Sequence, residues 1–294
     1  MQKINIRFQS KKFFISSGLT PLYIFLIGVT LVPFLMNIYF SFVDYYLVSP
    51  NKGQFIFFAN YLSVINDRTF WKVLGTTFYF SLGSVTIQLV IGIIMAFLFN
   101  SIKEKIKFLR IFIILPLAIS PVAISYSWVL MMDPSKGILN YLLSLIGVHP
   151  QLWFASYKFV IPSLLLVDTW QWLPFMVLVL TGAMLAQPEE PREAALVDGA
   201  NFFQLARYVT LPLLKPTIIF MVIIRFIDAF KIFDTIYIIT KGGPGNWSET
   251  LSIRTFKLGF NDLRMGEAAA LSIIILIILF LIFQTIIKRT RIFE

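Results

Sequence analysis

The chain has 294 residues, of which 58% are hydrophobic and 14% are charged, and its formal net charge is +10 at pH 7. A soluble domain carries about 25% charged residues, so this composition excludes an ordinary soluble protein. The chain has no cysteine and one histidine, His149. This excludes disulfides and cysteine-based metal or iron–sulfur sites, and we expect no metal site. The basic residues flank apolar blocks, which is typical of a membrane protein rather than of a nucleic-acid-binding protein.

Six apolar segments reach the roughly 20 residues that a membrane-spanning helix needs. They are residues 20–43, 73–99, 108–132, 159–185, 209–240 and 268–287. Prolines interrupt the third and fourth segments, which predicts kinked helices inside a bundle. The first segment is long and lacks a small-residue cleavage site, so we expect it to be retained in the membrane. The sequence therefore predicts an all-α integral membrane protein with six transmembrane helices.

The distribution of basic residues predicts the orientation. If the N-terminal tail is cytoplasmic, the cytoplasmic connections carry 14 Lys and Arg residues and the outer connections carry 9. The strongest bias lies in residues 101–110, which contain Lys103, Lys105, Lys107 and Arg110. An excess of basic residues marks the cytoplasmic side. We therefore predict cytoplasmic tails at 1–19 and 288–294 and a transmembrane domain at 20–287.

The cytoplasmic connection at 187–212 predicts two short helices. Pro191 suits the first turn of a helix, and Glu193 suits its positive end. Gly199 supplies the left-handed residue that ends a helix, and Asn201 is a good cap for the next one. We expect a helical hairpin on the cytoplasmic face, too polar to enter lipid.

This connection resembles the EAA loop of the permeases of ATP-binding-cassette (ABC) importers. The resemblance rests on Glu193-Ala194-Ala195, Gly199 and Leu211-Pro212 at fixed offsets, with Val209 where isoleucine is usual. It implies the type I importer permease fold, in which this loop between helices 4 and 5 docks on a separate ATPase subunit. The residues implied to make that contact are Glu193, Ala194, Ala195, Asp198 and Gly199. The plainer alternative is an amphipathic connecting loop without a partner.

Other segments resemble the sugar-importer branch, and more its maltose F-type or glycerophosphate A-type permease than the second permease. These segments are Leu115-Pro116, Ser120-Pro121-Val122, residues 225–234, Thr240–Pro244 and Gly266–Ser272. The resemblance implies import of a sugar or related polyol across the cytoplasmic membrane, with sn-glycerol-3-phosphate or another non-sugar solute as the alternative. It also implies a second homologous permease, two ATP-binding subunits and an extracytoplasmic solute-binding protein as partners.

The chain contains no Gly-x-x-x-x-Gly-Lys-Ser/Thr sequence, so we expect it to be a non-enzymatic subunit without a cofactor. ATP and Mg²⁺ would bind to the partner ATPase. A self-contained secondary transporter is a competing reading, and it predicts an inverted repeat and discontinuous helices. A membrane enzyme would need a convergent acid–base or metal constellation, for which one histidine and no cysteine provide little.

The fifth span carries four charges, Arg225, Asp228, Lys231 and Asp234. Charges are costly in lipid, so we predict that they neutralise one another, Arg225 with Asp228, and face the bundle interior or its outer mouth. Sugars bind through polar contacts and aromatic stacking, which makes polar and aromatic residues in the spans candidates for the solute path. The candidates are Phe230, Phe233, Asp234, Tyr237, Ser120 and Asp168. Helix packing and structural ion pairing are the alternative roles.

Overall fold

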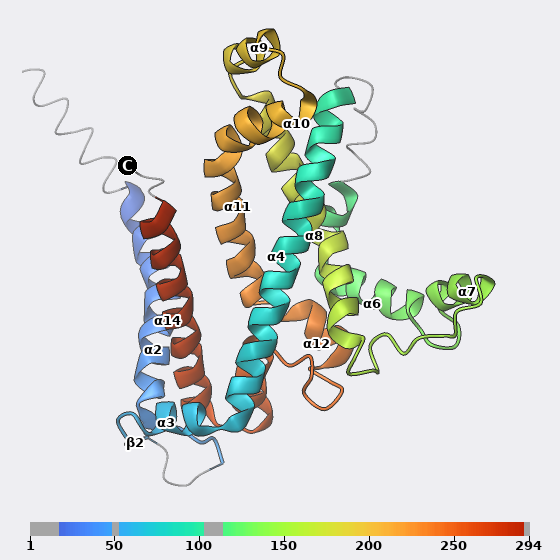
Figure 1. Ribbon diagram of the computed structural model, residues 1–294. Helices are drawn as coiled ribbons and strands as arrows, with labels where there is room; N and C mark the ends of the chain where they lie inside the picture. Colours follow the sequence, from blue (N-terminus) through green and yellow to red (C-terminus); the bar gives the residue numbers. More distant parts are fainter. Residues whose placement is uncertain (1–17, 49–52, 103–113, 291–294) are drawn as a thin grey trace, which may run out of the picture. The chain divides into compact units, whose positions relative to one another are not determined.

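The computed structural model describes residues 18–48, 53–102 and 114–290, which are mostly helical (Figure 1). The chain divides into two compact units, residues 1–67 with 255–276 and residues 68–254 with 277–294. Five helical segments of the described part are long and apolar enough to cross a membrane. They are Gly18–Ser41, Arg68–Asn100, Val160–Leu185, Phe202–Thr240 and Met265–Arg289.

These five segments correspond to the first, second, fourth, fifth and sixth predicted spans. The third predicted span, 108–132, begins among residues outside the described part. Its described portion is helical at 114–118, turns at Ser120 and continues as α6 (Pro121–Met131). The count of six spans therefore stays a prediction.

The first unit joins the end of the first span to the start of the last. The π-helical turn η1 (Ile27–Leu31) leads into α2 (Val32–Ser41), and strands β1 (Val43–Asp44) and β2 (Gln54–Phe55) pair antiparallel. Helix α3 (Ala59–Asn66) follows and runs across the end of α2 (Figure 1). The amide of Asn60 donates to the carbonyls of Ser41 at 3.0 Å and Val43 at 2.9 Å.

Helix α14 (Met265–Thr290) contacts this hairpin in its first turn, through Gly266. A Cβ on Gly266 would lie 2.5 Å from the carbonyl oxygen of Val43, so only glycine permits this approach. Its backbone N–H donates to Tyr45.

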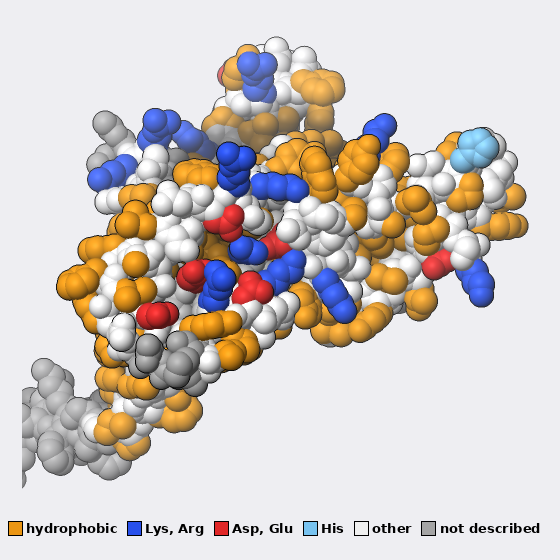
Figure 2. Space-filling view, turned by 90° about the horizontal axis from the view of Figure 1, so that it is seen from below, with side chains coloured by type: hydrophobic (Ala, Val, Ile, Leu, Met, Phe, Trp, Pro, Cys, Tyr) orange, Lys and Arg blue, Asp and Glu red, His pale blue; other side chains and the backbone are white. Residues whose placement is uncertain are grey.

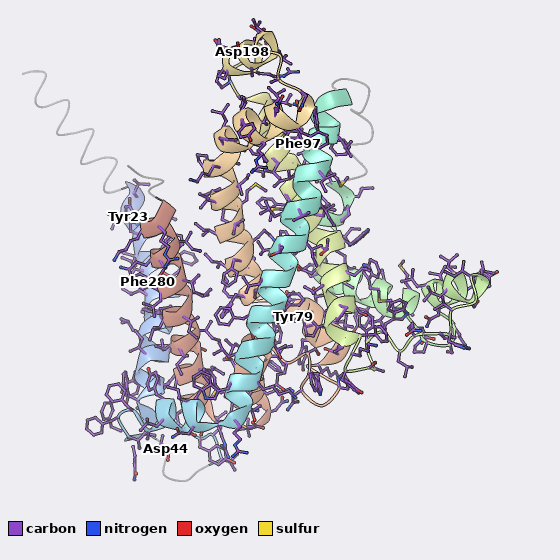
Figure 3. All side chains as sticks on the ribbon, in the orientation of Figure 1. Tyr23, Asp44, Tyr79, Phe97, Asp198 and Phe280 are labelled. Atoms are coloured by element: carbon purple, nitrogen blue, oxygen red, sulfur yellow. The ribbon has the colours of Figure 1, made fainter. Side chains whose placement is uncertain are left out.

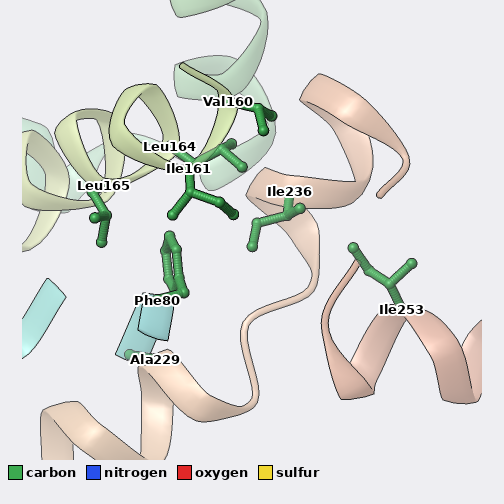
Figure 4. Packing of buried hydrophobic residues seen from close by; sticks show 8 residues of the cluster. All are labelled: Phe80, Val160, Ile161, Leu164, Leu165, Ala229, Ile236 and Ile253. Atoms are coloured by element: carbon green, nitrogen blue, oxygen red, sulfur yellow. The ribbon is translucent and has the colours of Figure 1, made fainter. Parts of the chain in front are cut away.

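The second unit is built on α4 (Arg68–Ile102) and α8 (Val160–Leu185), which pack along each other, with α11 (Leu211–Phe230) against both. Phe80 of α4 packs among Ile161, Leu164 and Leu165 of α8 (Figure 4). Elsewhere along the pair, a Cβ on Gly92 would lie 2.9 Å from Cβ of Met176, so a small residue lets these helices approach closely.

The shorter elements of the second unit connect these helices. They are α7 (Ile138–Leu145), α9 (Glu190–Val197), α10 (Phe202–Leu205), η2 (Ala206–Thr210), α12 (Asp234–Thr240) and the first four residues of α13 (Leu251–Phe256). The π-helical turn η3 (Lys257–Asn261) belongs to the first unit and precedes α14.

The fifth span is discontinuous, which corrects the expectation of one helix over 209–240. Helix α11 ends at Phe230, and α12 begins at Asp234 after a non-helical step. The hydroxyl of Thr250 donates to the carbonyl of Ile232 at 3.2 Å, and that of Ser252 donates to Lys231 at 3.0 Å. These bonds satisfy carbonyls that the break frees, as an apolar environment requires.

Candidate functional site

The connection between the fourth and fifth spans forms a helical hairpin at one end of the second unit. Its first helix, α9, lies beyond the ends of α4 and α8, and Asp198 marks its tip (Figure 3). Glu190 and Glu193 occupy its first turn and Pro191 its start. Acidic residues in the first turn stabilise the positive end of the helix dipole.

Local hydrogen bonds end α9 and begin α10 as predicted. Gly199 has φ +81°, its N–H donates to Leu196, and the N–H of Ala200 donates to Ala195. This pattern is a Schellman motif, which needs a left-handed residue after the helix. Asn201 and Gln204 then form a reciprocal capping box, with bonds of 3.0 and 2.8 Å.

The hairpin is exposed along its length, and no residue of α9 is buried. The five residues implied by the resemblance lie on this helix and its turn, four of them exposed and Ala195 half-buried. Large apolar side chains are exposed beside them, with Val197 89% and Phe203 81% accessible. An apolar patch beside charged residues on a segment too polar for lipid is typical of a protein-binding surface.

The base of the hairpin is attached to the ends of the spans. The amide of Gln187 donates to the carbonyl of Thr210 at 3.2 Å, which joins the two ends of the connection. Phe202 meets Phe97 of α4 edge to face, with ring centroids 5.8 Å apart. A cavity of about 200 Å³ lies behind α9, between these residues and Arg192. Apart from the chain itself, the hairpin is thus attached to the spans near its base, by the Gln187–Thr210 hydrogen bond and the Phe202–Phe97 contact.

A second polar site lies inside the second unit, between α4, α8 and α11. Arg225 donates from Nε to Gln88 at 2.9 Å and from Nη2 to Oδ2 of Asp168 at 2.9 Å. Gln88 and the hydroxyl of Ser84 also donate to this carboxylate oxygen. The guanidinium carbon lies 4.6 Å from the ring centroid of Trp172, a cation–π contact.

This network is closed to solvent. The side chains of Arg225 and Asp168 are 1% and 2% exposed. A buried ion pair costs less when further hydrogen bonds reach its polar atoms, and Gln88 and Ser84 supply such bonds to Nε and Nη2 of Arg225 and to Oδ2 of Asp168. The network thus joins three spans through one carboxylate.

The partner of Arg225 differs from the predicted one. Asp228, at i+3 on the same helix, is exposed, and so are Lys231 and Asp234. Arg225 instead pairs across to Asp168. The prediction was wrong because α11 turns Arg225 toward α4 and α8, whereas the next three charges lie on its outer side or beyond the helix break.

The six solute-path candidates do not form one surface. Phe230 is fully buried, packed against Phe78 and Phe226, and Asp168 is buried in the network, so neither lines an open path in this structure. Asp234 and Ser120 are exposed. Phe233 and Tyr237 are half-buried and stacked, with centroids 4.9 Å apart.

Sequence reasoning missed Ser84 and Trp172. Ser84 stands at i−4 from Gln88 in an otherwise apolar span, a spacing that places both on one helix face. That spacing indicates a polar face on α4, but it does not identify the partners on α8 and α11.

Comparisons with known sequences identify the family of the chain. Residues 88–292 match the family described as "Binding-protein-dependent transport system inner membrane component". The trehalose/maltose transport system permease protein MalF of Thermococcus litoralis is 34% identical over 82% of this chain and 82% of its own length. The trehalose transport system permease protein SugA of Mycobacterium tuberculosis is 32% identical over 87% of this chain and 81% of its own.

Solved structures share the fold. A bacterial ABC transporter involved in the import of the acidic polysaccharide alginate contains a chain with a TM-score of 0.84 and 22% identity, over 96% of each chain. A second structure of a bacterial alginate ABC transporter, in complex with an alginate pentasaccharide-bound periplasmic protein, gives the same score. The match shows the fold of an ABC importer permease.

Proposed function

The chain belongs to the family of binding-protein-dependent inner-membrane transport components, and from this premise we propose that it is the permease subunit of a sugar importer in the cytoplasmic membrane. The support for a sugar is the chemistry named for its relatives, trehalose and maltose among them. The observation that carries the mechanism is the exposed hairpin of α9 and α10 on the attachment described above.

The hairpin is the element through which we expect ATP hydrolysis to drive transport. Glu193, Ala194 and Ala195 would contact the ATPase subunit, with Asp198 and Gly199 at the turn. Small alanines allow a close approach, and the exposed Val197 supplies apolar area at the contact. Rotation of the ATPase subunits would move α9, and its attachments at Gln187 and Phe202 would pass that movement to the spans.

The complete transporter would contain this chain, a second homologous permease, two ATPase subunits that bind ATP and Mg²⁺, and a solute-binding protein. This chain would hold no cofactor. A related permease fold is found in complex with a periplasmic protein, which supports the last partner.

The structure favours a sugar over a phosphorylated solute. An anionic phosphate is bound most strongly by unpaired arginines. Arg225 lies deep in the spans, where its Nε donates to Gln88 and its Nη2 donates to Asp168. A phosphate at this cation would compete with a buried carboxylate that already neutralises it, so we do not favour the glycerol phosphate alternative.

Cross-linking tests the coupling contact. Because the chain has no cysteine, Ala194→Cys can be linked to a cysteine-scanned ATPase partner in the assembled complex. We expect a link at Ala194 that changes in yield when ATP is added. Ser135→Cys, in an outer loop, is the control and should give none. An assembled, transporting complex in which no ATPase position links to Ala194→Cys would contradict the assignment.

Transport tests the function itself. The complete complex in vesicles should transport a labelled sugar only when ATP is on the side of the ATPase subunits and the loaded binding protein is on the opposite side. Uptake by this chain alone, without ATP, would favour the secondary transporter. A complex that accumulates only phosphorylated or non-sugar solutes would contradict the sugar assignment and leave the coupling assignment intact.

A further inference from the structure

Helix α7 presents an apolar surface that no described part of the chain covers. Four large apolar side chains of the helix and that of its C-cap residue are between 48% and 74% exposed: Ile138, Tyr141, Leu142, Leu145 and Ile146. Ile138, Leu142 and Leu145 stand at i, i+4 and i+7, so they form one stripe along the helix. The helix has eight residues, far fewer than the roughly 20 needed to cross a membrane.

The opposite side of α7 is a hydrogen-bonded attachment centred on Asn140, which is almost fully buried. Its amide donates to the carbonyls of Asp133, Pro134 and Gln151. Its oxygen accepts from the N–H of Gln151 at 2.9 Å and from the indole of Trp153 at 3.0 Å. All four of its hydrogen-bonding valences are used within the outer loop, so the orientation of the apolar stripe is defined.

The loop before α7 is held by a similar local structure. The backbone N–H of Lys136 and the hydroxyl and N–H of Ser135 donate to Asp133 and hold the pKa of that carboxyl below its ordinary value. These three hydrogen bonds form an ordered turn, through which α7 is attached.

Helix α3 of the first unit also has an exposed apolar stripe opposite a buried asparagine. Phe58, Leu62 and Ile65 are exposed at i, i+4 and i+7, whereas Asn60 and Val64 are buried on the other side. Asn60 bonds to the carbonyls that end α2, as Asn140 bonds within its own loop. Two short outer helices thus carry an apolar stripe opposite a buried asparagine.

We propose that α7 and α3 are interfacial helices whose apolar stripes lie in the outer leaflet of the lipid bilayer. An amphipathic helix of this kind lies in the membrane plane with its apolar side among the upper acyl chains. In Figure 1 α7 projects sideways from α6 and α8 of its own unit, and α3 runs across α2 of its own unit. Both directions suit a helix in the plane of the membrane.

Composition favours lipid over a protein as the occupant. Residues 137–157 and 53–66 contain no Asp, Glu, Lys or Arg. A docking surface for a soluble protein has a polar rim with charged residues, whereas the charges nearest in sequence to the stripe of α7 are those at the two ends of its loop, Asp133, Lys136 and Lys158. In Figure 2 the pale blue histidine marks the segment after α7, and orange hydrophobic side chains lie beside it among white atoms. Tyr141 and Tyr157, both exposed, are typical of the level where acyl chains meet headgroups.

Continuity with a membrane span adds a separate argument for α3. The most apolar window of the preceding helical segment, Gly18–Ser41, has no buried residue, as expected for a span surrounded by lipid or by another subunit. The stripe of α3 follows its outer end after the short hairpin. Phe57, between hairpin and helix, has φ +51° and remains 66% exposed. A bulky residue at positive φ is uncommon, so the surrounding fold imposes this backbone conformation between hairpin and helix.

Spin labels test the proposal in the complete transporter, reconstituted in phosphatidylcholine vesicles with the other subunits made cysteine-free. Leu142→Cys and Leu145→Cys carry the label on the stripe, and Ser144→Cys carries it on the exposed polar side of the same helix. A label in lipid collides often with dissolved oxygen, which concentrates in the bilayer. A label in water collides often with a soluble nickel chelate. We expect higher oxygen and lower nickel accessibility at Leu142 and Leu145 than at Ser144. The pair Leu62→Cys and Ser63→Cys should repeat this difference on α3.

Three results would overturn the proposal. Equal nickel accessibility at Leu142, Leu145 and Ser144 would place the stripe in water. Protection of the stripe from both reagents would place it against another subunit. Loss of the Leu142 signal when loaded binding protein is added would make the stripe a docking surface. None of these results depends on which solute is carried.

Discussion

The two polar regions of the second unit are maintained by different means. The hairpin of α9 and α10 is exposed, and bonds between residues at most five positions apart form its turn and its cap, such as those of Gly199 and of Asn201 with Gln204. The Arg225 network is buried, and its bonds between helices join residues 57 to 141 positions apart. Water can replace any bond of the hairpin, but nothing replaces a bond of the network. Disruption should therefore be local in the hairpin and global in the network.

The largest effect should follow from Asp168→Asn. It leaves the Arg225 cation buried without a counter-charge, which costs about 3–5 kcal/mol. We expect loss of assembled complex and a lower thermal transition. The double variant Asp168→Asn/Arg225→Gln removes both charges and should recover part of the loss. Additive effects of the two single changes in this cycle, measured on thermal stability, would show that the pair does not interact.

A smaller effect is expected for Gly199→Val. Nothing lies within 4 Å of the Cβ position, so the change acts only through the backbone at φ +81°. A left-handed conformation costs a non-glycine residue about 1–2 kcal/mol. We expect normal assembly with reduced transport per ATP hydrolysed. Gly199→Asn, which tolerates this conformation better, is the matched control. An unchanged ratio of transport to ATP hydrolysis in the valine variant would show that the left-handed turn at Gly199 is not needed for coupling.

Thr250→Val probes the break in the fifth span. It removes the hydroxyl that donates to Ile232. We expect the free energy of unfolding to fall by about 1 kcal/mol, measured by thermal denaturation of the complex. Thr285→Val removes a hydroxyl bonded within its own helix, to Leu281, and should change stability less. Equal effects of the two changes would mean that Thr250 has no special part in holding the break.

The smallest effect should follow from Asp228→Asn. Asp228 carries the same charge as Asp168 and lies three residues from Arg225, but it is exposed. We expect a change within about 0.5 kcal/mol in thermal stability of the complex. A loss comparable to that of Asp168→Asn would restore the original pairing of Arg225 with Asp228.

The break at Lys231–Phe233 shows whether helix continuity can distinguish an ABC importer permease from a secondary transporter. Discontinuous helices were expected of a secondary transporter, yet this chain has one and belongs to the binding-protein-dependent family. The freed carbonyls need only local hydroxyl donors, which any bundle can supply. Helix continuity is therefore a poor criterion between these two classes.

The sequence alone determined the membrane class, the positions of five described spans and the local structure of the hairpin. Hydropathy identifies a span because each helix must satisfy its own backbone in lipid. Caps at Gly199 and Asn201 are readable because they involve neighbours in sequence. Only the tertiary structure decided that Arg225 pairs with Asp168, that Phe230 is buried, and that the fifth span breaks where Thr250 and Ser252 supply donors. These outcomes depend on the rotation of helices about their axes and on partners distant in sequence, and periodicity in an almost uniformly apolar span does not specify either.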